Sequence, residues 1–411
     1  MFLLFFLTFK IFILSNHYIE HDELVNLTTY FYKETIFLKN YPNNHFFISF
    51  LGLITEFFVG TKLVFLKFIN YLSLPIILYI SYLSFKNKFL TYLLFLIYLL
   101  SDLLFTFSFV LRGYYISSLF FCLIFYLILE IHYKAEIKKL NLIYLICALQ
   151  VINNISSLYL VVPILFSILL NLKTFTLREK FKFFFIYFLI IFFIFNLTQI
   201  LITGLYIEGY YDSPKNLFSY ISQNYNNIFT AGFKRIYLST FTSYPLSENI
   251  KNFVLQLRDN IDILTIFSLT FFTILFNIYK RKLTIFDIIV IYFFIFFFLI
   301  NKFPPERVYV GFIYFFIFYL FFNIKNFKFK INLINYFIIL IIFIVIYFEK
   351  NPYRNLQTLM TTEKKIMNEF VCNLKKSRIQ EIEKHMYYYL YLKNCNRKRN
   401  LKEFINFYRG N

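Results

Sequence analysis

Long apolar segments separated by short polar or basic stretches recur along most of the chain. Apart from the amino terminus, they cover residues 66–84, 89–105, 113–131, 141–156, 158–172, 183–204, 263–279, 283–300, 308–324 and 331–348. These lengths suit helices that cross a bilayer, whose hydrocarbon core takes about 20 apolar residues. With a shorter first segment at residues 1–15, the pattern predicts an all-α polytopic membrane protein with about eleven transmembrane helices.

The amino-terminal segment differs from a cleaved signal peptide. Residues 1–15 carry Lys10 near their middle, and they lack both the basic start and the small-residue cleavage site that a signal peptide needs. We therefore expect an uncleaved first helix with its amino end in the cytoplasm.

Two further segments predict helices that lie at the membrane surface instead of crossing it. Segment 24–38 has apolar residues at helical spacing, and His45–Gly60 is apolar throughout most of its length. If His45–Gly60 crossed the membrane, every later basic loop would lie outside. We therefore place both as interfacial helices in the first external loop, residues 16–65.

Basic loops set the expected topology, because Lys and Arg are enriched on the cytoplasmic side. These loops are Lys86–Lys88, Lys134–Lys139, Lys173–Lys182, Lys280–Lys282 and Lys325–Lys330. The external side then holds loop 16–65, turns Ser101–Arg112 and Asn153–Ser156, loop 205–262, and turn Asn301–Arg307. Residues 1–348 form the predicted bundle, and the odd span count places the polar tail, residues 349–411, outside. We expect a multi-pass protein of a bacterial inner (plasma) membrane.

Composition narrows the classes of partner. Hydrophobic residues make up 59% of the 411 residues, above the roughly 45–50% of soluble domains. The 63 Phe and 36 Tyr accompany many Ile, Asn and Lys, as in a genome rich in A and T, so they do not indicate stacking of bases. The net charge of +20 comes from loops and the tail, and we expect no nucleic-acid partner.

The four cysteines fall into two groups by their location in the sequence. Cys122 and Cys147 lie in apolar segments and are interpreted as buried thiols. Cys372 and Cys395 lie in the tail, where a disulfide and two separate thiols are both open.

The first candidate site follows the first apolar segment, where His21, Asp22 and Glu23 stand together. Carboxylates at the amino end of an interfacial helix complement the helix dipole, which explains the pair without catalysis. Ionisable groups at the end of a transmembrane helix bundle are also frequently functional. We favour the functional interpretation of Asp22 and Glu23, with the dipole interpretation as the alternative.

Other external turns offer substrate-binding candidates. His45 heads the second interfacial segment, after the turn Tyr41–Asn44. Arg112 precedes Tyr114 at the outer end of a span, and Arg307 follows Pro304 and Pro305 in a later turn. An Arg at such a place either anchors its helix by snorkelling or binds a phosphate through parallel hydrogen bonds.

The order of these features resembles the GT-C superfamily of polyprenyl-phosphate-dependent glycosyltransferases, with dolichyl-phosphate-mannose-protein mannosyltransferase-like and bacterial lipopolysaccharide-type members nearest. The residues that carry the resemblance are His21-Asp22-Glu23, Asn43-Asn44-His45-Phe46-Phe47, Arg112-Gly113-Tyr114 and, more loosely, Pro305-Glu306-Arg307-Val308-Tyr309. It covers roughly residues 1–320, and the short first helix departs from the family's pattern.

The resemblance implies an inverting transfer of a sugar from a polyprenyl-phosphate donor to a lipid, glycan or protein acceptor on the external, periplasmic side. Asp22 is the expected general base, supported by Glu23; His45, Arg112, Tyr114 and Arg307 are the expected substrate-binding residues. Some members of the family use a divalent metal ion (Mg²⁺ or Mn²⁺) and others use none. Asp22, Glu23 and His45 would be its ligands here, and the sequence leaves both alternatives open.

Other functions compatible with the pattern are an O-antigen ligase or polymerase, a multispan lipid or solute transporter, and a non-catalytic membrane scaffold. A ligase would use basic residues in a large late loop, as Lys234, Arg235 and Arg258 offer in loop 205–262. A transporter would place its polar residues near the midplane on interrupted helices.

Overall fold

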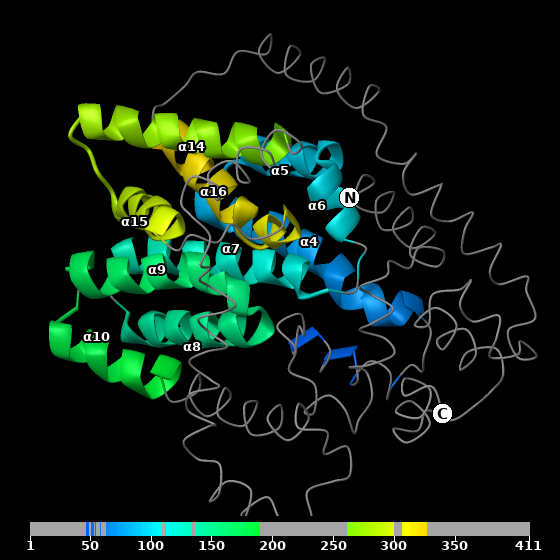
Figure 1. Ribbon diagram of the computed structural model, residues 1–411, viewed down its shortest axis with the longest axis horizontal. Helices are drawn as coiled ribbons and strands as arrows, with labels where there is room; N and C mark the ends of the chain where they lie inside the picture. The colour runs from blue at the N-terminus through cyan, green and yellow to red at the C-terminus, as the bar shows by residue number, and fades with distance from the viewer. Residues whose placement is uncertain are drawn as a thin grey trace, which may run out of the picture.

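The computed structural model describes residues 47–48, 51–52, 54, 58, 63–108, 110, 112–133, 136–173, 175–189, 261–299 and 306–326. Every regular element among them is a helix, which confirms the predicted all-α class (Figure 1). In chain order they are α4 (Leu63–Phe85), α5 (Lys88–Leu100), α6 (Asp102–Phe107), α7 (Gly113–Tyr133), α8 (Ile137–Asn153), η2 (Ile155–Ser157), α9 (Leu158–Asn171), α10 (Leu177–Phe183), η3 (Phe184–Leu189), α14 (Ile261–Tyr279), α15 (Ile285–Leu299) and α16 (Glu306–Asn326).

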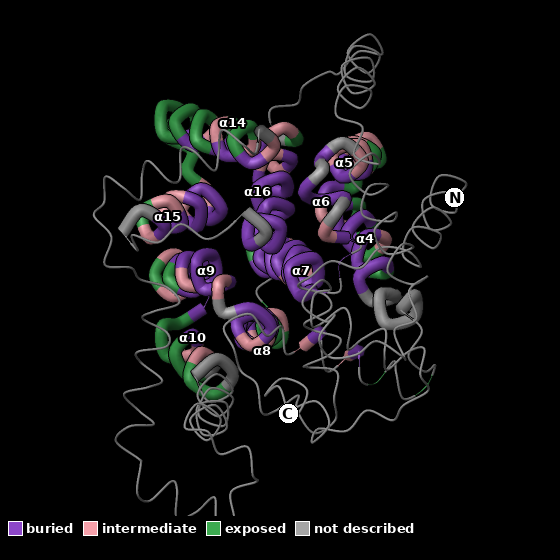
Figure 2. Tube along the Cα trace, turned by 45° about the vertical axis from the view of Figure 1, so that its right-hand side comes forward, coloured by how far each residue is buried: buried purple, intermediate pink, exposed green. Residues whose placement is uncertain are grey.

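Within the described residues, three helices are long and apolar enough to cross a membrane. They are Gly113–His132 in α7, Asp262–Tyr279 in α14 and Val308–Lys325 in α16. Most residues of the α7 and α16 segments are buried, 72% and 78%, against 28% for α14. Helices α7 and α16 therefore form the centre of the bundle, and α14 lies at its surface (Figure 2). The predicted first helix and the predicted span 331–348 lie outside the described residues.

Helices α7 and α16 run parallel and touch along small residues. The Ser118 hydroxyl donates to the carbonyl of Val310 at 2.6 Å. A Cβ on Gly311 would lie 3.3 Å from the Cβ of Ser117, so glycine permits this close approach. Further along, the ring of Phe125 packs edge-on against Phe318, with centroids 5.6 Å apart.

Of the remaining helices, α8 and α15 run opposite to this pair, and α14 runs in the same direction. Helix α8 is antiparallel to α7, since Asn153 contacts Gly113 while Lys139 contacts Glu130. Helix α15 is antiparallel to α16, because Phe297 packs on Tyr309 and Asp287 bonds to Tyr319. Helix α14 runs parallel to α16, with Phe267 near Tyr309 and Asn277 bonded to Asn323.

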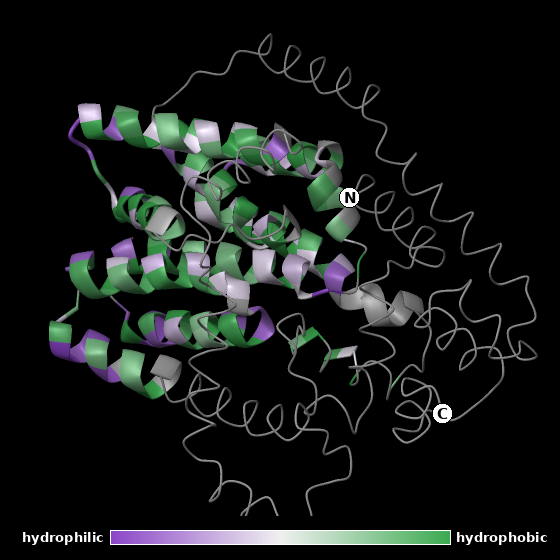
Figure 3. Ribbon diagram, viewed as in Figure 1, coloured by the Kyte–Doolittle hydropathy of each residue, from purple (hydrophilic) through white to green (hydrophobic). Residues whose placement is uncertain are grey.

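The bundle consequently has two different ends. At the Arg112 end, helices α7, α14 and α16 begin and α8 and α15 finish. At the other end, the basic end, the directions reverse. The described basic residues there lie in or next to the α4–α5, α7–α8, α9–α10 and α14–α15 connections and in the last turn of α16. They are Lys86, Lys88, Lys138, Lys139, Lys173, Arg178, Lys180, Lys182, Lys280, Arg281, Lys282 and Lys325. Hydrophilic positions are visible along α10 and in the α14–α15 turn in Figure 3.

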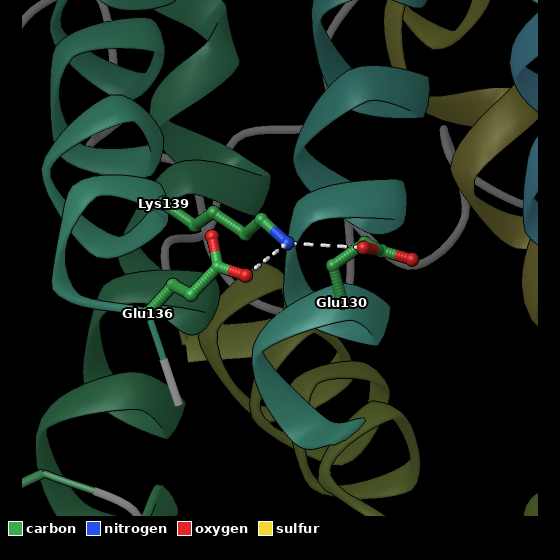
Figure 4. A network of polar contacts seen from close by, with 3 residues as sticks. All are labelled: Glu130, Glu136 and Lys139. Carbon is green, nitrogen blue, oxygen red and sulfur yellow. Dashed lines mark hydrogen bonds and ion pairs between the residues drawn. The ribbon is translucent and has the colours of Figure 1, made fainter. Parts of the chain in front are cut away.

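One ion-pair cluster joins α7 to α8 at the basic end. The ammonium of Lys139 lies 3.0 Å from a carboxylate oxygen of Glu130 and 3.3 Å from one of Glu136 (Figure 4). The hydrogen bond to Glu130, with a smaller contribution from Glu136, raises the pKa of Lys139. The cluster ties the start of α8 to the end of α7.

Two predicted spans have different boundaries in the structure. The segment predicted at 89–105 is interrupted, because α5 ends at Leu100 and Ser101 has an extended backbone. The hydroxyl of Ser101 then accepts from the amide of Leu104 and starts α6. The segment predicted at 183–204 is preceded by helix α10, which begins at Leu177 inside the stretch predicted as the basic loop Lys173–Lys182. A capping box of Thr176 and Glu179 starts this helix.

Candidate functional site at the Arg112 end

A tight turn between α6 and α7 positions Arg112. The backbone amide of Arg112 donates to the carbonyl of Val110 at 2.7 Å, which closes a three-residue turn. The same carbonyl accepts a hydrogen bond from the side-chain amide of Asn70, which is fully buried on α4. Helix α4 therefore fixes the turn from which Arg112 projects.

The side chain of Arg112 is only 2% exposed. Its guanidinium carbon lies 5.8 Å from the centre of the Tyr114 ring, a cation–π distance, and the ring of Phe107 packs edge-on against Tyr114. Arginine keeps its charge when buried, so burial is costly and tends to mark a functional position in a membrane protein. The structure thus brings the predicted residues Arg112 and Tyr114 into direct contact.

A polar layer from α8 supports the first turn of α7. Asn153 donates from its side chain to the carbonyl of Gly113 at 2.9 Å and to the hydroxyl of Ser117 at 3.1 Å. Gln150, one turn earlier on α8, donates to the carbonyl of Ser117 at 3.4 Å. Each of these side chains is buried, so hydrogen bonds between side chain and backbone hold the start of α7 in place.

Helix α16 completes this end of the bundle. The hydroxyls of Tyr115 and Tyr314 lie 3.0 Å apart between α7 and α16. Since Val310 contacts Ser118, the first turn of α16, which contains Arg307, starts beside the first turn of α7. The predicted residue Arg307 therefore belongs to the same end as Arg112, and its side chain lies outside what the structure describes.

The acidic half of the predicted site, Asp22 and Glu23, lies outside the described residues, as does His45. Phe47, two positions after His45 in sequence, packs against Phe120 on α7, with the ring centroids 5.3 Å apart. Among the described residues no group of three His, Cys, Asp or Glu side chains is placed to hold a metal ion. The predicted metal ligands are not among those residues, so the choice between a metal-dependent and a metal-independent site stays open.

Sequence reasoning missed several polar residues of this end. Asn70 lies inside a segment predicted only as apolar, and Gln150 was assigned no role. Within the described structure, Oδ1 of Asn70 and Oε1 of Gln150 are buried acceptors without a hydrogen-bond partner. Amide side chains inside apolar spans were the available signal, because polar groups at membrane depth need partners.

A second buried polar cluster, missed in the sequence, lies at the basic end. Asp287 accepts from Asn277 at 2.7 Å, from the Tyr319 hydroxyl at 2.6 Å, and from the amide and hydroxyl of Thr284 at 2.6 and 2.7 Å. Asn277 also donates to Asn323 at 2.8 Å. We call these five residues the Asp287 clasp. All four described donors to Asp287 are uncharged, and together they join α14, α15 and α16.

The arrangement defines the molecule as a helical membrane-type bundle with a buried cation at one end and a cap of basic turns at the other. Comparison of the chain with protein-family models, curated proteins and solved structures gives no match. The assignment of function consequently depends on the chain's own residues.

Proposed function

We propose that the protein is a GT-C-type integral membrane glycosyltransferase, which moves a sugar from a polyprenyl-phosphate donor to a lipid, glycan or protein acceptor. The observation that carries the proposal is the burial of Arg112 against Tyr114 at the end opposite the basic turns. A desolvated guanidinium is suited to a phosphate monoester or diester, which it binds through two parallel hydrogen bonds.

The distribution of charge supports the orientation. With the basic end in the cytoplasm, Arg112 and the first turn of α16 face the exterior, where a lipid-linked donor would present its sugar. The full chain then has about eleven spans in a bacterial inner membrane, with the active site on the periplasmic side. Asp22, Glu23 and His45 belong to the first external loop in this topology.

The proposed reaction is a single displacement at the anomeric carbon of the sugar. Asp22 takes the proton from the acceptor hydroxyl, whose oxygen forms the new glycosidic bond as the bond to the phosphate oxygen breaks. Arg112, with Tyr114 beside it and Arg307 from α16, stabilises the polyprenyl phosphate that leaves. Glu23 and His45 orient the acceptor or the donor. The configuration inverts, because one base acts without a second, nucleophilic carboxylate.

The role of Asp22 is tested by sugar transfer in membranes that contain the full-length protein. With a panel of polyprenyl-phosphate hexoses and pentoses as donors, Asp22→Asn should reduce product by about 100-fold or more, the usual contribution of a general base. Glu136→Gln, which removes a carboxylate at the basic end, is the matched control and should retain transfer. Near-normal product from Asp22→Asn at equal abundance would exclude Asp22 as the base.

A further inference from the structure

The turn between α14 and α15 presents three consecutive basic side chains, Lys280, Arg281 and Lys282, all of them exposed. Lys325, also exposed, follows in the last turn of α16, which the hydrogen bond between Asn277 and Asn323 holds beside the end of α14. Within residues 261–299 and 306–326, the acidic residue at this end is Asp287, and it is fully buried. The surface here is therefore strongly positive.

The backbone of this turn adopts a conformation that favours glycine. The amide of Lys282 donates to the carbonyl of Asn277, and that of Arg281 donates to the carbonyl of Ile278, which is the Schellman pattern of a helix end. Arg281 occupies the left-handed position of the motif, with φ of 52°. A side chain at this position is unfavourable relative to glycine. Replacing Arg281 by glycine would therefore relieve the backbone while it removes one positive charge.

The turn is also held in place by the buried Asp287 clasp. Thr284 and Asp287 cap the start of α15, while Asp287 bonds to Asn277 on α14 and to Tyr319 on α16. The Asp287 clasp thus fixes both ends of the turn, and the three cations project from a defined backbone. Preorganised donors of this kind lose little freedom when they bind an anion.

Directly beside the turn, the last two turns of α14 expose apolar side chains. Leu275, Phe276, Ile278 and Tyr279 are between 42% and 80% exposed. The ammonium of Lys280 lies 5.5 Å and 5.6 Å from the ring centres of Phe276 and Tyr279. A cation that extends past exposed aromatic rings is typical of the boundary between hydrocarbon and headgroups.

We infer that the turn Lys280–Lys282 binds the phosphate headgroup of an anionic phospholipid, whose acyl chains lie along the exposed face of α14. Lys325 adds a fourth positive charge from α16. The combination of clustered cations, an apolar lipid-exposed helix and a fixed turn favours a lipid over a free anion, because only a lipid uses both surfaces. This lipid site is independent of the proposed sugar transfer and lies at the opposite end of the bundle.

The test uses the full-length protein in detergent with fluorescent phosphatidylglycerol, competed by unlabelled phosphatidylglycerol or phosphatidylcholine. Binding should saturate, and phosphatidylglycerol should compete while phosphatidylcholine should not. Arg281→Gly should weaken binding about fivefold, since one cation near an anionic headgroup contributes about that factor. The same variant should raise the melting temperature by about 1–3 °C, because glycine suits the left-handed position.

Lys86→Gly is the matched control, since Lys86 also has a positive φ, of 51°, and ends α4 in another basic turn. It should gain similar thermal stability and keep phosphatidylglycerol affinity. Unchanged affinity of Arg281→Gly, or equal loss in Lys86→Gly, would overturn the assignment to this turn. Competition by inorganic phosphate as strong as that by phosphatidylglycerol would overturn the lipid as occupant.

Discussion

At the scale of single residues, a role for Arg112 could be predicted from the sequence, whereas the support for its position could not. Its position at the end of an apolar segment, followed by Tyr114, predicted a substrate-binding role from the sequence. Its contact with Tyr114 follows from local spacing, and the structure places both side chains in the interior. The support from Asn70 on α4 could not be predicted, because it joins residues 40 positions apart through one carbonyl.

Gly311 allows a prediction about stability at the same scale. The Cβ of Ser117 lies 3.3 Å from where a Gly311 side chain would begin, so there is little room between α7 and α16. Gly311→Val should reduce the free energy of unfolding by about 2–3 kcal/mol through overpacking. In Gly311→Ala, a gain in helix propensity of up to about 1 kcal/mol offsets much of the strain.

Thermal unfolding of both Gly311 variants in detergent measures the difference. Equal melting temperatures for the alanine and valine variants would show that the two helices do not approach as closely as the structure indicates.

At the scale of elements, the long apolar segments located most of the described helices but not their ends, and α10 lies in a stretch predicted as a basic loop. The helix ends depend on single polar side chains: Ser101 separates α5 from α6, and Thr176 starts α10. The arrangement of α14, α15 and α16 could not be predicted at all. It depends on the Asp287 clasp, whose members come from three separate segments.

The clasp itself is testable through Asp287→Asn. The asparagine keeps one carbonyl oxygen, but its NH₂ group would face donors from which the carboxylate accepted hydrogen bonds. Buried donors without an acceptor are costly. We expect a loss of about 2–4 kcal/mol in the free energy of unfolding. Thr284→Val removes only one of the four donors and should cost about 1 kcal/mol. Chemical or thermal unfolding of the purified variants gives the comparison, and an Asp287→Asn protein as stable as the native one would contradict the clasp.

For the whole molecule, the two ends predict opposite accessibility. In a background with Cys372 and Cys395 replaced by Ser, Ser156→Cys should react with a membrane-impermeant thiol reagent in intact cells. Lys173→Cys and Lys282→Cys should react only after permeabilisation, because the basic end faces the cytoplasm in the proposed topology. The native Cys122 and Cys147 are buried, so they should stay unlabelled in the folded protein. Labelling of Lys282→Cys in intact cells would reverse the orientation.

The overall architecture was predictable only in its class. Apolar segments and basic loops indicate a multi-helix membrane protein, since each span satisfies its own backbone hydrogen bonds. Which helices occupy the centre was not predictable, because α7, α14 and α16 have similar apolar composition and differ in their neighbours. Of the candidate site, Arg112 and Tyr114 are brought together, while the roles of Asp22, Glu23 and His45 stay predictions.

The central claim is that Arg112 binds the phosphate of a polyprenyl-linked donor, and it can be measured without knowledge of the sugar. The measurement is the affinity of the purified full-length protein for polyprenyl monophosphate, compared between the native protein and Arg112→Gln. Loss of charged hydrogen bonds to a phosphate should weaken binding about 10- to 100-fold. Lys86→Gly, at the opposite end and outside the proposed lipid site, should bind as the native protein does. Native affinity in a folded Arg112→Gln protein would contradict the claim.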